Sequence, residues 1–206
     1  MFNLEHPMIA LTFDDGPLFE GSTATEILNT LHQYNLHATF FYCGHSITPH
    51  TAPEILTAYQ NGHEIGNHTY HHIDLTTLTS EEMIKEFELT QRKLSEITGL
   101  NHFLTRAPYL SYNDLLLQTL PTPFIGTSVD SKDWSGISAP QIIDHILTQI
   151  HDGAIILMHE NQPHTSEALP ILIPKLLELG YQFTTVSHLM QLKGHTLHNG
   201  KVYNQA

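Results

Sequence analysis

Short apolar segments alternate with longer helical patterns along almost the whole chain, and this alternation limits the fold more than any other feature. The apolar segments are 8–13, 38–43, 63–67, 102–106, 124–129, 153–158 and 182–186. Helical patterns cover about 23–35, 51–61, 79–98, 112–120, 138–150 and 166–179, with a short one after Ser187. A helix between two strands returns the chain in the same direction, so the strands are expected to pair in parallel. The pattern predicts an α/β fold, a distorted or incomplete (β/α) barrel of about seven βα units, with an open doubly wound sheet as the alternative.

Local signals refine some of these predicted elements. Thr79, with Glu82 three residues later, predicts a capping box at the start of the third helix, and Gly99 predicts its end. Pro170 and Pro174 interrupt the last long pattern, so a helix there is expected to start late or to kink. Residues 196–206 show no clear core pattern, and we expect a loosely packed end.

Length and composition exclude several classes of protein. The 206 residues, 40% hydrophobic and without low-complexity stretches, suit a single catalytic domain spanning 1–206. The formal net charge of −13 disfavours nucleic acid and anionic lipid as partners. No apolar run is long enough for a membrane span, and the first residues lack a secretory pattern. The expected location is therefore cytoplasmic by default, or secreted or at the cell surface if a leader was removed, and the sequence does not indicate an oligomeric state.

Polar clusters follow five of the predicted strands, at the points where those strands end. In parallel α/β folds the loops after the carboxyl ends of the strands share one face, so we expect these clusters to converge there. They are Asp14-Asp15-Gly16-Pro17, Gly66-Asn67-His68-Thr69-Tyr70-His71-His72, Arg106-Ala107-Pro108-Tyr109, Asp130-Ser131-Lys132-Asp133-Trp134 and His159 after Leu157-Met158.

The second cluster contains two histidines four residues apart, His68 and His72. Two imidazoles at this spacing lie on one side of a helical turn, and one added carboxylate completes the ligand set of a catalytic divalent ion. Asp15 is the natural third ligand, and His71 is a rival to His72. We therefore expect one divalent metal ion, with zinc as the leading candidate and cobalt, nickel or manganese as alternatives.

A cation at this position would separate the roles of the two adjacent acids. A carboxylate bound to the metal is occupied, whereas its neighbour Asp14 stays free to accept a proton from an activated water. Arg106 follows the adjacent predicted strand and could hold Asp14 ionised by a bidentate pair.

These clusters resemble, in order, the motifs of the polysaccharide deacetylases, carbohydrate esterase family 4, also called the chitooligosaccharide deacetylase homology domain. The matching segments are T-F-D-D-G-P, H-T-Y-H-H, R-A-P-Y, D-S-K-D-W and L-M-H, spread over nearly the whole chain. The resemblance implies a distorted (β/α) barrel that removes acetyl groups, N-acetyl above all, from a glycan or oligosaccharide by metal-activated water. An acetylated carbohydrate is accordingly the expected substrate.

The resemblance also assigns roles to individual residues. Asp14 would be the base, and the metal ligands would be Asp15, His68 and His72. Arg106 would brace Asp14, the backbone N–H of Tyr109 would help to stabilise the oxyanion, and Asp133 would orient His159, the acid. The pocket for the acetyl methyl group would be lined by Trp134, Leu157 and Pro108. Two positions depart from the family pattern, Leu110 where glycine is usual and Glu160 where aspartate is common.

Each cluster also has a purely structural interpretation. Asp14 and Asp15 could cap a turn, Arg106 and Asp133 could form ordinary ion pairs, and His159 could be a core histidine. At the level of the whole chain, the alternatives to a deacetylase are a catalytically silent glycan-binding module and an amidohydrolase acting on a small non-sugar amide.

Overall fold

The computed structural model describes residues 2–18 and 22–206. Its main sheet has the order β3, β2, β1, β6, β5, with β7 pairing with β1. The strands are β1 (Met8–Gly16), β2 (Thr39–Tyr42), β3 (Glu64–Asn67), β5 (Val129–Asp130), β6 (Ile155–His159) and β7 (Gln182–Phe183). All of these strand pairs are parallel. The expected parallel α/β class is confirmed.

A short second sheet extends the curve of the first. It consists of β4 (Phe124–Ile125) and β8 (Val202–Tyr203), which are also parallel. Thr105 forms isolated bridges to Asn67 at the end of β3 and to Phe124 in β4. Within residues 2–18 and 22–206 the ladders themselves do not close into a complete ring, although an isolated antiparallel bridge between Ala154 and Gln205 also links the segment after β8 to the residue just before β6; this is consistent with a distorted or incomplete barrel.

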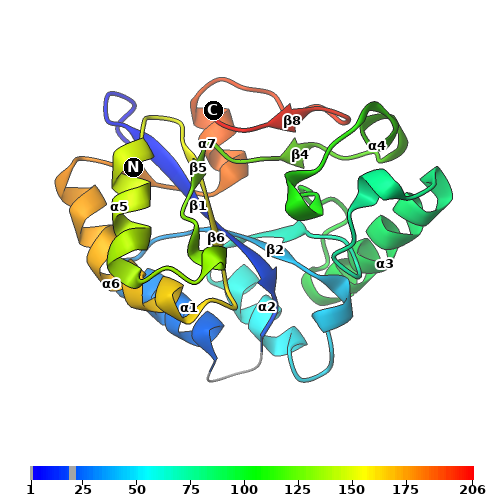
Figure 1. Cartoon of the computed structure of the whole chain (residues 1–206), viewed down its shortest axis with the longest axis horizontal. Coiled ribbons are helices and arrows are strands. Elements are labelled where there is room, and N and C mark those ends of the chain that lie inside the picture. The colour runs from blue at the N-terminus through cyan, green and yellow to red at the C-terminus, as the bar shows by residue number, and fades with distance from the viewer. Residues whose placement is uncertain (1, 19–21) are drawn as a thin grey trace.

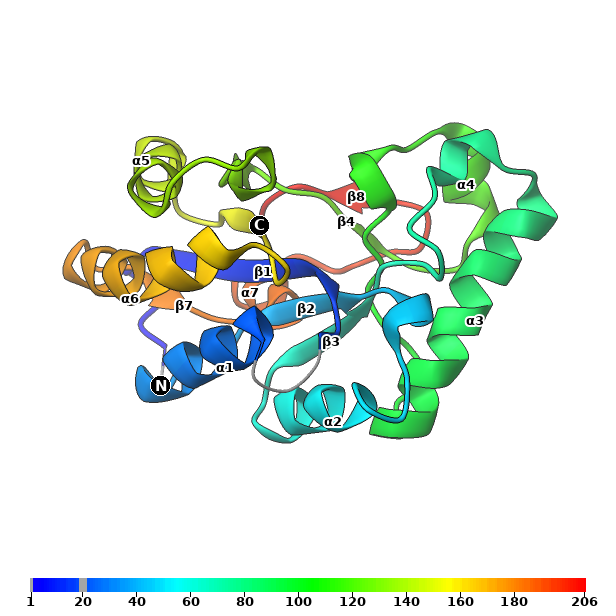
Figure 2. The same cartoon turned by 60° about the horizontal axis from the view of Figure 1, so that its bottom comes forward.

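Helices surround the strands, as Figure 1 and the turned view in Figure 2 show. They are α1 (Thr23–Gln33), α2 (Ala52–Gln60), α3 (Ser80–Thr98), α4 (Asp114–Thr119), α5 (Ala139–Gln149), α6 (Pro163–Glu178) and α7 (Val186–Leu192). Short 3-10 turns occur at η1 (Gly44–Ser46), η2 (Leu75–Thr77), η3 (Pro108–Leu110) and η4 (Asp133–Ser135). Helix α6 packs between α1 and α5, and α2 packs against α3. No helix in the described part of the chain combines the length and apolar character that crossing a membrane requires.

The central strand β1 is buried on both faces because its side chains alternate between two clusters. Ile9, Leu11 and Phe13 belong to the large core beneath α1, α2, α5 and α6. Met8 and Ala10 belong to a second cluster, which includes residues of α7. Full burial of one such large aliphatic or aromatic side chain contributes roughly 1.5–3 kcal/mol. The even-numbered face continues beyond this cluster with polar residues that form part of the site.

The predicted strand boundaries hold for some segments and fail for others. The segment 102–106 contains only the single bridging residue Thr105, because its partner β4 is two residues long. The segment 124–129 is divided into β4 and β5, which pair with different neighbours. Strand β8 lies in the tail that was expected to be loose, and the Ala206 N–H donates to the Gly153 carbonyl at 2.9 Å. The expectation of a loosely packed end was wrong.

Helix boundaries follow their local signals more closely. The capping box of Thr79 and Glu82 is present, and Gly99 ends α3 with φ of 75°. Helix α6, by contrast, runs from Pro163 through both Pro170 and Pro174 without starting late. Each internal proline removes one backbone hydrogen bond, but the helix buries a continuous apolar face that offsets the loss. That face consists of Ala168, Leu169, Leu172, Ile173 and Leu176.

Candidate active site

A cavity of about 400 Å³ opens where β1, β3 and β6 end. All five polar clusters contribute lining residues, and Leu110 directly after the third cluster adds one more: Asp14, Asp15, His68, His72, Ala107, Tyr109, Leu110, Asp130, Trp134, Leu157 and His159. The predicted convergence of these clusters is therefore observed.

Asp14 lies on the inner face of β1, next to a fully buried arginine. Arg106 Nη1 donates to Asp14 Oδ1 at 2.8 Å and to Thr12 Oγ1 at 2.7 Å. Its other nitrogens donate to the carbonyls of Ile125 and Gly126, so the contact with Asp14 is single and the bidentate pair expected from the sequence is not formed. The second oxygen, Asp14 Oδ2, lies 3.7 Å from His68 Nε2 and receives no hydrogen bond from the guanidinium.

Three candidate metal ligands lie close together on the side of the Asp14 carboxylate away from Arg106: Asp15, His68 and His72. Asp15 Oδ1 lies 3.5 Å from His68 Nε2 and 3.3 Å from His72 Nε2, and the three candidate ligand atoms lie within 4.8 Å of one another. Asp15 Oδ1 is buried without a hydrogen-bond partner in the described structure. One carboxylate and two imidazoles form a donor set suited to a catalytic divalent ion. These residues therefore fit such an ion.

A hydrogen bond of His68 and the surroundings of His72 favour this interpretation. His68 Nδ1 donates to the Arg106 carbonyl at 2.8 Å, because a carbonyl can only accept, and this leaves Nε2 free to bind a cation. Burial and the neighbouring His68 lower the pKa of His72, which keeps its ring neutral. Burial would raise the pKa of Asp15, but the nearby His68, His159 and His72 lower it overall, so the carboxylate is ionised.

The pair is brought together by an irregular loop rather than by the helical turn expected from the sequence. Residues 68–72 have no helical structure, and Thr69 and His72 have φ of 66° and 56°. The His68 and His72 rings nevertheless lie 4.9 Å apart between centroids. His71, the rival ligand, has its Nδ1 2.7 Å from Glu86 Oε1 and does not join the cluster.

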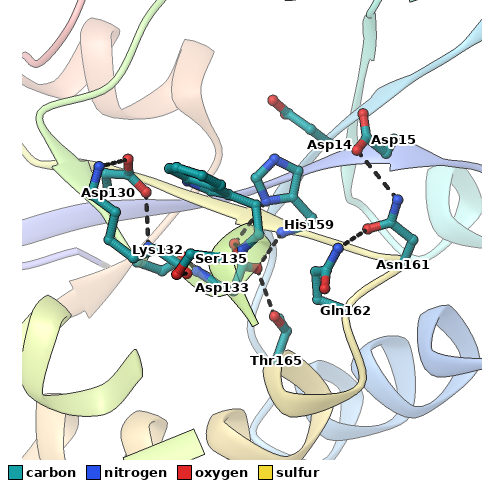
Figure 3. Close-up of polar contacts among 12 residues, drawn as sticks. Asp14, Asp15, Asp130, Lys132, Asp133, Ser135, His159, Asn161, Gln162 and Thr165 are labelled. Carbon is teal, nitrogen blue, oxygen red and sulfur yellow. Dashed lines mark hydrogen bonds and ion pairs between the residues drawn. The ribbon is translucent and has the colours of Figure 1, made fainter. Parts of the chain in front are cut away.

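The other side of the cavity carries a histidine and carboxylate pair, shown in Figure 3. His159 Nδ1 lies 2.7 Å from Asp133 Oδ1, and the His159 backbone N–H donates to Oδ2 at 2.7 Å. Thr165 Oγ1 also donates to Asp133 Oδ2, at 2.6 Å. Burial lowers the pKa of His159, but the hydrogen bond and charge of Asp133, with the charges of Asp14 and Asp15, raise it to about 9. The His159 ring is therefore in its protonated, positively charged form at neutral pH.

The residues expected to line the acetyl pocket are placed differently from one another. Trp134 and Leu157 line the cavity, whereas Pro108 is buried in η3 and is not among its lining residues. Its neighbours Ala107 and Leu110 line the cavity in its place. Tyr109 is 68% exposed, and its ring packs edge-on against the His72 ring at 4.8 Å.

Sequence reasoning did not identify several residues that support the site. Thr165 and Thr12 contact Asp133 and Arg106, while Asn161 Nδ2 donates to Asp15 Oδ2 at 3.3 Å. Asn161 lies two residues after His159, so its position alone was a signal. Thr12 was also detectable, because it lies two residues before Asp14 and so shares its face of the strand.

Known proteins resemble this chain over most of its length. The sequence model described as polysaccharide deacetylase matches residues 3–121, more than half of the chain. The chain belongs to the polysaccharide deacetylase family. Among its relatives is a Bacillus cereus peptidoglycan-N-acetylglucosamine deacetylase, 32% identical over 90% of this chain and 89% of the relative. The peptidoglycan-N-acetylmuramic acid deacetylase PdaC of Bacillus subtilis is 37% identical over 90% of this chain and 39% of the relative.

A solved structure also matches this chain over nearly the full length of both chains. The family 4 acetyl xylan esterase from Clostridium thermocellum, in complex with a cobalt ion, gives a TM-score of 0.91 at 32% identity and covers 97% of this chain and 98% of that chain. The chain spans only 31% to 41% of the length of the first curated relatives that it matches.

Proposed function

We propose that residues 1–206 form a catalytic domain that hydrolyses acetyl groups on a glycan, with a divalent metal ion as cofactor. One observation carries the proposal: a cluster suited to a cation and a protonated His159 face the same cavity, with Asp14 next to both. Asp14 pairs with His159 in the β1–β6 ladder, and its Oδ2 lies 3.7 Å from His68 Nε2. A base, a cation site and an acid are the groups that amide or ester hydrolysis requires.

Asp15, His68 and His72 would hold the cation, with zinc as the leading candidate. A divalent ion there would polarise the acetyl carbonyl and lower the pKa of a water molecule. Asp14 would accept the proton of the attacking water at Oδ2, since Oδ1 is engaged by Arg106. The buried guanidinium of Arg106 fixes the orientation of the carboxylate by donating to Oδ1, which leaves Oδ2 available as the base.

The remaining roles fall to the other wall of the cavity and to η3. The Tyr109 backbone N–H would donate to the oxygen that gains negative charge during attack. His159 would donate its Nε2 proton to the departing nitrogen or oxygen, since Nδ1 faces Asp133. The products are acetate and a free amine or hydroxyl. Trp134 and Leu157 would contact the acetyl methyl group.

The substrate class is an acetylated carbohydrate, and we favour an N-acetylated amino sugar. A relative that this chain covers over 89% of its length is described as a peptidoglycan-N-acetylglucosamine deacetylase. The net charge of −13 is compatible with a neutral glycan, or with one that becomes cationic as its amines are released.

Acetate release tests this function directly. The metal-free protein and the protein reloaded with zinc or cobalt would be incubated with N-acetylglucosamine oligomers, peptidoglycan fragments and acetylated xylan. We expect acetate from at least one substrate, its loss with a chelator and its recovery with added metal. Asp14→Asn should keep metal binding and lose most turnover, whereas His72→Ala should lose both.

Two results would contradict the proposal. Turnover by Asp14→Asn at the wild-type rate would remove the proposed base. Metal binding without acetate release from any of these substrates would favour the binding module, and release from a small non-sugar amide alone would favour the amidohydrolase.

A further inference from the structure

The loop that carries both histidines of the cation cluster is held in an uncommon backbone conformation. Thr69 and His72 both have positive φ, which residues other than glycine rarely adopt. No regular secondary structure maintains residues 68–72. Surrounding contacts must therefore keep this backbone in place.

Helix α3 supplies contacts to both ends of the loop from two consecutive residues. Glu86 is 6% exposed, and its Oε2 accepts from the backbone N–H of Tyr70 at 3.2 Å and of His71 at 2.7 Å. Its Oε1 lies 2.7 Å from His71 Nδ1. The next residue, Phe87, accepts from Asn67 Nδ2 at 3.0 Å through its carbonyl.

The contact of the Phe87 carbonyl reaches the loop through the side chain of Asn67. Asn67 Oδ1 accepts from the Thr69 N–H at 2.8 Å, so the same amide side chain ties the start of the loop to α3. On the other side, the N–H groups of Gly44 and His45 donate to the carbonyls of Thr69 and Tyr70, both at 2.9 Å. Those contacts fix carbonyl groups, whereas Glu86 is the side chain that accepts from the N–H groups of Tyr70 and His71.

We propose that Glu86 is a positioning residue for the cation site, which acts by fixing the backbone of Tyr70 and His71 so that His68 and His72 converge on Asp15. The proposal rests on the proposed function, because it concerns the same cation. It also accounts for the position of His71: the contact with Glu86 occupies its Nδ1 and keeps its ring out of the cluster, where a three-residue spacing had made it a rival ligand.

The chemistry of the three contacts predicts which replacements are tolerated. Glu86→Ala removes all three contacts and leaves two backbone N–H groups without their partner. Glu86→Gln can keep the geometry, because its amide oxygen can accept from both N–H groups and its amide nitrogen can donate to His71 Nδ1. Glu86→Asp keeps the charge, but it is one methylene shorter and cannot reach all three groups.

Zinc affinity of the metal-free proteins, measured by competition with a chromophoric chelator, tests the proposal. Loss of residues that orient metal ligands typically weakens binding by about 10- to 100-fold, and we expect a loss of that size for Glu86→Ala. Glu86→Gln should remain within about threefold of the wild-type affinity, and Glu86→Asp should bind less tightly than Glu86→Gln. Glu88→Ala is the matched control, because Glu88 is an exposed acid on the same helix, and its affinity should not change.

Urea denaturation of the metal-free proteins separates positioning from general stabilisation. Under conditions where both proteins are folded, a positioning role predicts that Glu86→Ala still binds zinc more weakly than the wild type. The absorption bands of bound cobalt should also change in Glu86→Ala and return in Glu86→Gln. If Glu86→Ala does not fold, the order of the Gln and Asp variants still decides the question.

Three outcomes would overturn the proposal. Wild-type affinity in Glu86→Ala would show that the loop holds its shape without this carboxylate. Tighter binding by Glu86→Asp than by Glu86→Gln would show that charge, rather than geometry, matters. An equal loss in Glu88→Ala would point to a general effect of helix charge. Wild-type protein that binds no zinc would instead contradict the proposed function itself.

Discussion

Replacing Asp133 by asparagine should move the pH dependence of the reaction, because Asp133 determines the protonation of His159. Burial by itself lowers the pKa of His159, and the hydrogen bond and charge of Asp133 are the largest influences that raise it to about 9. A bound cation would offset the smaller contributions of Asp14 and Asp15, so the expectation rests on Asp133. In Asp133→Asn, we expect the pKa of His159 to fall to its ordinary value of 6.5 or below.

The magnitude follows from these two values. At pH 8 about nine-tenths of His159 is protonated when its pKa is about 9, and only about 3% when it is 6.5. If the protonated ring is the acid, kcat/KM at pH 8 should fall about 30-fold from this cause alone, and the fall should be much smaller at pH 6. The alkaline limb of the kcat/KM profile should therefore move to lower pH.

Asp133→Asn should also alter how the stability of the metal-free protein depends on pH. Because folding raises the pKa of His159, its contribution is fully present below about pH 6.5 and is lost as the pH rises through about 9. Asp133→Asn should remove this dependence between those two values. Denaturant titrations at several pH values and NMR titration of the His159 ring would measure both effects.

Asp144→Asn is a suitable control, because Asp144 is an exposed acid on α5 and lies outside the site. It should leave the pH profile unchanged. An alkaline limb at the same pH in Asp133→Asn and in the wild type would refute the reasoning, even if the overall rate fell.

Three further predictions concern the packing beneath the site. Arg106→Met should leave the Asp14 carboxylate buried without its cation and lower the free energy of unfolding by roughly 3–5 kcal/mol; an unchanged urea midpoint would contradict this. Gly16→Ala would place a Cβ 1.5 Å from Glu160 Oε2 and should cost about 1–3 kcal/mol, which a thermal melt at wild-type temperature would disprove. Burial and the charges of Glu54, Asp15 and Asp14 raise the pKa of Glu160 well above its ordinary value, so the wild type loses stability as the pH rises above about 4.5. Glu160→Gln should therefore be more stable than the wild type at pH 8 and lose this advantage near pH 4, and an equal difference at both pH values would count against it.

The sequence predicted which residues converge on the cavity better than it predicted the local structure around them. Asp14 and His159 could be placed on one face because each ends an apolar run, and parallel strands align their carboxyl ends. The pair His68 and His72 was also found, but through an assumed helical turn that does not exist. Spacing alone could not reveal the positive φ angles of the loop or the contribution of Glu86, which comes from a helix about fifteen residues away.

Short strands account for most of the errors in the fold. A two-residue strand such as β8 has no period to detect, and its stability comes from its partner β4 rather than from its own sequence. The continuity of α6 through its two prolines also depends on packing that local sequence does not reveal. Proline propensity argues against a helix, but the burial of its apolar face against the core outweighs that preference.

The direct pairing of Asp14 with His159 has a consequence for how such a site can diversify. Because the two residues occupy opposing positions on hydrogen-bonded strands, the distance between them follows from the strand spacing of about 4.8 Å. Insertions or replacements in the rim segments near Tyr109 and Trp134 leave that spacing unaltered. For the proposed reaction, preference for one sugar over another could therefore change through the rim while Asp14 and His159 stay in register.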